Sequence, residues 1–154
     1  MFVVKEICID KNTEIVEQKT LYAEPMNRDN CVRKTVDFLN HEYNTKNLEA
    51  EEFYIIGLSP EYQIKYVLTM KGEEHKVDVS IFQFFCFVWK TKSKYIICAH
   101  NHPNGVCEPS DEDVETMLQF EDICKQFNSI LYEDLVITND GYYEVIEDEE
   151  RSYD

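Results

Sequence analysis

Two histidines and an aspartate lie close together in the stretch AHNHPNGVCEPSDED, residues 99–113. His100 and His102 end an apolar run, and Asp113 follows a loop that contains proline and glycine. Imidazole nitrogens and carboxylate oxygens bind zinc, and three protein ligands leave a fourth position open, as in catalytic zinc sites. Such an ion lowers the pKa of its bound water to about 7. The stretch therefore predicts a catalytic site with one Zn²⁺ per chain, held by His100, His102 and Asp113.

Each part of this stretch also has an ordinary structural explanation. Ser110 and Asp113 form S-x-x-D, which is close to a helix capping box. Single histidines are more often surface or core residues than ligands. Cys107, in the loop, is either an incidental residue or a redox-sensitive accessory ligand. The two histidines and the aspartate taken together favour the metal site.

A strand and a helix must position these side chains. YIICA, residues 95–99, is typical of a short strand in a mixed sheet that is covered on both faces. Alternate residues of a strand share a face, so Cys98, His100 and His102 are expected to project the same way. Residues 110–127 predict an amphipathic helix that folds Asp113 back toward the strand end. Its buried side is expected to carry Val114, Met117, Leu118 and Cys124.

The rest of the chain predicts an α/β domain. The expected elements are a hairpin over 2–9 and 13–23, a helix over 31–43, strands over 51–59 and 62–70, a buried helix from about Ser80, and a closing hairpin around Asn139-Asp140-Gly141. The turn of that last hairpin is expected to have its residues at positive φ. The acidic tail, residues 148–154, follows.

The pattern H-x-H-P-x6-S-x-x-D resembles the metal motif of the JAB/MPN metallopeptidases, also called JAMM proteins. HNHPNG followed by EPS is similar to the form found in the RadC-like branch of that superfamily. EEFYIIGL, VDVSIFQFF and LYEDLVITNDGYYEV resemble further segments of this branch. The resemblance covers roughly residues 28–147, is specific at the motif and is looser elsewhere.

The resemblance implies a curved mixed β-sheet flanked by helices, with zinc held by the three residues named above. It also implies a glutamate that acts as general base and then as general acid. The E-x-F pattern assigns this role to Glu51, and Glu52, on the opposite face of the strand, is the alternative. Ser110 matches the family's serine, whose hydroxyl would donate a hydrogen bond to the developing oxyanion.

The sequence departs from the family pattern at three places. Asn104 replaces the usual serine after His-Pro. Glu133-Asp134 stands where the branch has Asp-His, which suggests different recognition. Residues 1–24 are not explained by the resemblance and form an N-terminal extension ahead of the RadC-like domain, which spans residues 25–147.

The formal net charge of −16 argues against direct binding to nucleic acid. The chain shows no transmembrane run or secretory signal, so we expect a cytoplasmic protein with reduced cysteines. The favoured function is hydrolysis of a peptide or isopeptide bond by metal-activated water, with a protein, a peptide or a ubiquitin-like tail as substrate. The alternatives are a DNA-repair or plasmid-associated accessory and a non-catalytic protein-binding scaffold.

Overall fold

A seven-stranded mixed sheet organises the chain in the computed structural model, which describes residues 1–72 and 78–146. The expected acidic tail lies outside these described residues. The strands are β1 (Phe2–Ile9), β2 (Ile15–Ala23), β3 (Glu52–Leu58), β4 (Ile64–Lys71), β5 (Tyr95–Asn101), β6 (Ile130–Thr138) and β7 (Gly141–Glu144). The helices are α1 (Cys31–Tyr43), α2 (Ile81–Thr91) and α3 (Asp111–Gln126), with a short 3₁₀ helix, η1 (Thr45–Asn47).

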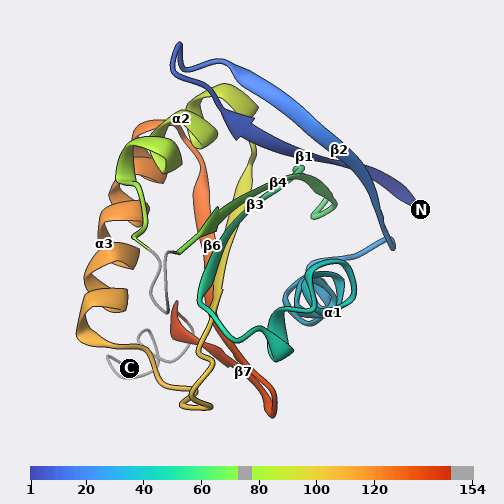
Figure 1. Cartoon of the computed structure of the whole chain (residues 1–154). Helices are drawn as coiled ribbons and strands as arrows, with labels where there is room; N and C mark the ends of the chain where they lie inside the picture. The colour runs from blue at the N-terminus through green and yellow to red at the C-terminus, as the bar shows by residue number, and fades with distance from the viewer. Residues whose placement is uncertain (73–77, 147–154) are drawn as a thin grey trace.

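The strands lie in the order β2-β1-β4-β3-β5-β6-β7. The pairs β1–β4 and β5–β6 are parallel, and the other neighbours are antiparallel. The sheet curves, with α2 and α3 on one side and α1 on the other (Figure 1). The expectation of a mixed sheet flanked by helices is confirmed.

Side-chain alternation along the central strands builds one hydrophobic core on each face of the sheet. Phe53, Ile55 and Cys98 belong to the core shared with α2 and α3. Tyr54 and Ile56, between them in β3, belong to the core shared with α1. Since both faces are buried, β3 and β5 read as nearly continuous apolar runs.

The helices on the metal-motif side begin at serines. The Ser80 hydroxyl accepts a hydrogen bond from the backbone N–H of Gln83, and Ser110 caps α3 in the same way. Met117 and Cys124 face the core as expected, but Leu118 does not, because it is 51% exposed. The buried side of α3 is therefore narrower than its sequence pattern predicts.

The N-terminal hairpin is part of the single sheet. β1 pairs with β2 and also lies parallel to β4, where Lys5, Glu6 and Ile7 are opposite Tyr66, Val67 and Leu68. At the other edge, the turn between β6 and β7 places only Gly141 at positive φ, not Asn139 or Asp140. No helix in the described part of the chain is long and apolar enough to cross a membrane.

Candidate metal centre

Three nitrogen and oxygen donors converge where β5 ends and α3 begins. The Nε2 atoms of His100 and His102 are 3.0 Å apart. Asp113 Oδ2 lies 3.2 Å from His100 Nε2 and 3.3 Å from His102 Nε2. Among the described residues, this is the one group of three such side chains with donor atoms within 4.8 Å of one another. The structure thus brings together the residues that the sequence pattern grouped.

The two histidines reach this point in different ways. His100 is buried within β5, opposite Phe53 of β3. His102 lies just beyond the strand, where its backbone N–H donates to the carbonyl of Ile137. Its Nδ1 is 2.8 Å from the carbonyl oxygen of Val106, so Nδ1 carries a proton, and in the neutral imidazole the Nε2 lone pair is available to a metal ion.

Asp113 is held by the start of α3. Its Oδ2 accepts a hydrogen bond from the Ser110 backbone N–H at 2.9 Å, and its own N–H donates to Ser110 Oγ at 3.1 Å. The capping box expected as the structural alternative is therefore present, and the same carboxylate also faces the imidazoles. Asp113 can therefore be a helix-capping residue and a metal ligand at the same time.

Hydrogen bonding within this group shifts the pKa values of Asp113 and His102. Burial raises the pKa of Asp113, but hydrogen bonds from His100 and His102 outweigh it and hold that pKa well below its usual range. The hydrogen bond to Asp113 raises the pKa of His102, against the opposing effect of burial. The nearby Glu51 charge acts in the same direction on His102.

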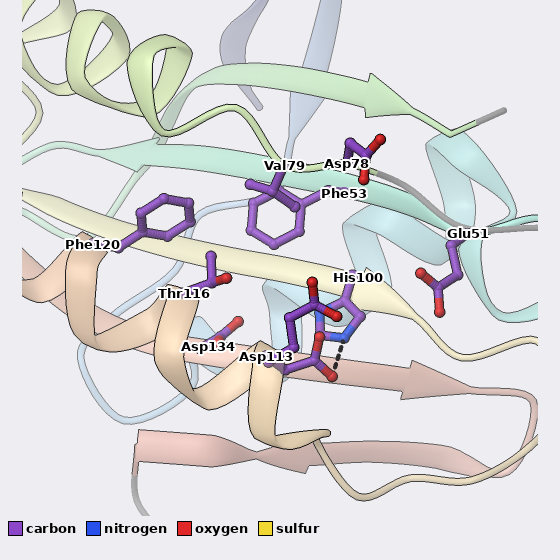
Figure 2. A pocket seen from close by; sticks show the side chains of 10 residues that line it. Glu51, Phe53, Asp78, Val79, His100, Asp113, Thr116, Phe120 and Asp134 are labelled. Atoms are coloured by element: carbon purple, nitrogen blue, oxygen red, sulfur yellow. Dashed lines mark ion pairs between the residues drawn. The ribbon is translucent and has the colours of Figure 1, made fainter.

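Glu51 and Glu52 occupy different faces of the sheet. Glu51 immediately precedes β3 and lines a pocket with His100 and Asp113, and Figure 2 shows its side chain reaching toward His100. Glu52 instead accepts a hydrogen bond from the Tyr54 hydroxyl at 2.6 Å and lies 4.0 Å from Lys71 Nζ. The geometry therefore favours Glu51 over Glu52 for a role at this centre.

Asn101 fixes the backbone on both sides of Glu51. Its Oδ1 accepts a hydrogen bond from the Glu52 N–H at 2.7 Å, and its Nδ2 donates to the Ala50 carbonyl at 3.0 Å. Sequence reasoning missed this residue, although its place between the two histidines was a signal. Asn101 therefore holds the backbone on either side of Glu51.

The pocket beside the donors has a volume of about 170 Å³. Five acidic side chains line it: Glu51, Asp78, Glu112, Asp113 and Asp134. The apolar part of its wall is formed by Phe53, Val79 and Phe120 (Figure 2). It is an acidic site with partly apolar walls.

Asp134 is the second residue that sequence reasoning did not place at the site. It lies in β6 opposite Cys98, is 4% exposed, and its Oδ1 has no hydrogen-bond partner. Burial raises its pKa to about 7, although the charge of His100 lowers it. The signal available in the sequence was an acid inside the apolar run LYEDLVIT.

Two other candidates lie at the margin. Ser110 is exposed, serves as the cap of α3, and is not among the described residues that line the pocket. The Cys107 thiol lies 3.9 Å from the carbonyl oxygen of Val136 and does not belong to the group of three donors. A role for Cys107 as an accessory ligand has no support in this arrangement.

The donor set fits a tetrahedral zinc ion. Bonds of 2.0–2.1 Å at tetrahedral angles separate neighbouring ligand atoms by about 3.3 Å. The three distances of 3.0, 3.2 and 3.3 Å come close to this value. His100, His102 and Asp113 could thus bind such an ion with little rearrangement.

The mixed sheet, the flanking helices and this group of donors are those of a JAB/MPN domain. The family model described as RadC-like JAB domain matches residues 30–151. The chain belongs to this family.

Curated relatives agree with the assignment. The chain is 27% identical over 139 residues to a UPF0758 protein of Fusobacterium nucleatum, an alignment that covers 90% of this chain and 56% of that protein. A UPF0758 protein of Acinetobacter baumannii is 26% identical over 113 residues, covering 73% and 47%. One from Staphylococcus haemolyticus is 31% identical over 99 residues, covering 64% and 43%. The chain spans about half the length of these relatives, and their names state no activity.

Proposed function

We propose that this domain is a zinc-dependent hydrolase that cleaves a peptide or isopeptide bond. The observation that carries the proposal is the convergence of three zinc-type donor atoms, 3.0–3.3 Å apart, beside a pocket that Glu51 also lines. A purely structural site would have four protein ligands, whereas three leave a position open for chemistry. Membership of the RadC-like JAB family supports the same conclusion.

His100, His102 and Asp113 would hold the ion. When bound, zinc lowers the pKa of a water molecule and polarises a carbonyl group. The Glu51 carboxylate accepts a proton from the attacking water as general base and then donates that proton to the leaving amine as general acid. The Ser110 hydroxyl accepts one hydrogen bond from Asp113 N–H and retains its own hydrogen, which it can donate to the developing oxyanion.

The first experiment is zinc content by elemental analysis of protein purified without chelator. Wild type is compared with His102→Ala and with His41→Ala, which removes a histidine whose side chain is 85% exposed in α1. We expect about one zinc per chain in wild type and in His41→Ala, and none in His102→Ala. A wild type that takes up no zinc when zinc is supplied would contradict the hydrolase and favour a protein-binding scaffold.

The second experiment is a cleavage screen with zinc-loaded protein against peptide and isopeptide substrates, including ubiquitin-like tails. Cleavage by wild type that is lost in Glu51→Gln supports the proposal. Zinc binding with no cleavage of any substrate, and no effect of Glu51→Gln on any phenotype, contradicts catalysis.

A DNA-associated role has no comparable support. The formal net charge is −16, and acids line the pocket at the proposed centre, so phosphate groups would be repelled from it. Salt-sensitive binding to duplex or branched DNA would be the result that revives this alternative.

A further inference from the structure

The pocket beside the donor group carries more acid than the proposed chemistry needs. Asp113 is engaged by Ser110 and both histidines, and Glu51 has a role in proton transfer. Asp78, Glu112 and Asp134 also line the pocket, and no lysine or arginine does so among the described residues. These three acids have no part in the proposed reaction.

Asp134 shows that this excess of acid is more than a solvated surface. Its side chain is more than nine-tenths buried, and Oδ1 has no partner in the described structure. Burying a carboxyl group without a partner costs free energy, and native proteins rarely leave such an atom unsatisfied. Asp134 lies between β6 and α3, on the pocket wall (Figure 2). A cationic ligand in the pocket would satisfy it.

The other walls indicate the shape of that ligand. Phe53 and Phe120 are buried aromatic residues, and Val79 packs beside them on the same core. A long aliphatic stem could lie against these side chains while its charged end reaches the acids, as lysine and arginine side chains commonly do. A small hydrated ion would gain nothing from the apolar surface.

We infer that this pocket binds a lysine or arginine side chain of the substrate, close to the bond that is cleaved. The inference rests on the proposed hydrolase function for the position of that bond. Asp134 forms the buried end of the subsite, and Asp78 and Glu112 supply further negative charge. The net charge of −16 would also attract basic peptides over a longer range.

A binding experiment tests the ligand without requiring turnover. The probes are N-acetyl-lysine methylamide and N-acetyl-norleucine methylamide, which share an aliphatic stem and differ in the ammonium group. Each is titrated into ¹⁵N-labelled, zinc-loaded full chain and followed by amide chemical shifts. We expect the lysine probe to bind about tenfold more tightly, with shifts centred on Thr116 and Asp134. Equal binding of both probes, or shifts elsewhere, would overturn the inference.

Variants of the pocket acids test which residues cause the preference for the lysine probe. Asp134→Asn and Asp78→Asn should each reduce the preference for the lysine probe, and Asp78 is exposed, so its replacement does not disturb the core. The matched control is Asp122→Asn, an exposed acid of α3 outside the pocket, which should bind both probes as wild type does. A preference unchanged in both pocket variants contradicts the assignment.

The competing occupant is a second metal ion held by the same acids. Two zinc ions per wild-type chain, falling to one in Asp134→Asn, would overturn the proposed subsite. Cleavage of lysine and norleucine peptides with equal kcat/KM would contradict this inference and leave the hydrolase intact. Selective binding of the lysine probe without cleavage of any peptide would contradict the hydrolase and leave the ligand class intact.

Discussion

The two faces of the sheet differ in whether their polar side chains have hydrogen-bond partners. On the α1 face, the Tyr54 hydroxyl donates to Glu52 at 2.6 Å and the Tyr43 hydroxyl donates to Glu6 at 2.7 Å. On the α3 face, His100 Nδ1 and Asp134 Oδ1 are the two buried side-chain atoms without a partner in residues 1–72 and 78–146. One face satisfies its polar groups internally, and the other leaves capacity for a ligand. Such local departures from full satisfaction are expected at functional sites.

The neighbouring glutamates give the sharpest test of this difference. We expect Glu51→Gln to lower kcat about 10²–10⁴-fold, the usual contribution of general acid–base catalysis, without changing zinc content. Glu52→Gln should leave kcat unchanged and lower the free energy of unfolding by about 1 kcal/mol, because glutamine still accepts the Tyr54 hydrogen bond but carries no charge. Steady-state kinetics and urea unfolding measure both. The opposite pattern would move the general base to Glu52.

The two cores offer a second comparison. Leu39→Ala, in the core shared with α1, and Phe120→Ala, in the core shared with α3, should each cost about 2–5 kcal/mol in the free energy of unfolding. Phe120 stacks on Phe84 and also lines the pocket, so its loss should raise KM as well. Leu39→Ala should leave KM unchanged in the folded fraction. Equal effects on KM would mean that the faces are not functionally distinct.

The buried carboxyl of Asp134 predicts a pH dependence of stability in the metal-free protein. Its folded pKa of about 7 is raised above the ordinary value, so its favourable contribution is present below about pH 4 and is lost as pH rises toward 7. The loss should be about 4 kcal/mol, for a shift of about three pKa units at about 1.4 kcal/mol each. Asp134→Asn should remove this slope between about pH 4 and 7. Urea unfolding across this range tests it, and a wild-type slope retained in Asp134→Asn would contradict it.

The smallest change in kcat or stability is expected from replacing two asparagines whose side chains hydrogen-bond to the backbone of a loop. Asn101→Ala frees the backbone around Glu51, and we expect kcat to fall about tenfold because the proposed general base is less well positioned. Asn40 Oδ1 accepts a hydrogen bond from the Lys46 N–H on the α1 side, so Asn40→Ala should affect only stability. An Asn101→Ala variant with normal kcat would show that the hydrogen bonds of Asn101 stabilise the fold and do not affect the reaction.

Much of the fold could be predicted because its signals are local. The helical spacing of Val36 and Leu39 and the apolar run YIICA indicated α1 and β5, and both are present. Leu118 was wrongly placed because periodicity does not fix how wide a strip of α3 the sheet covers. The parallel pairing of β1 with β4 joins segments about 60 residues apart, and no local pattern encodes such a contact.

The residues of the candidate site also differ in whether a local sequence pattern predicts them. His100, His102 and Asp113 could be grouped because one short loop links them. Asp134 and Asn101 left only weaker signals, an acid inside an apolar run and a polar residue between the two histidines, because their places at the site depend on neighbouring strands. Asp134 reaches the pocket only because β6 lies parallel to β5, and Asn101 acts only because β3 is its antiparallel neighbour.

The capping box at the start of α3 has a consequence for the entropy of ligand binding. A free aspartate side chain samples several rotamers, and a ligand that fixes one of them must offset that loss of entropy. Asp113 is already held in one orientation by the Ser110 N–H. Its rotamer freedom is therefore given up during folding, and a cation binding between the imidazoles meets a carboxylate that is preorganised to receive it.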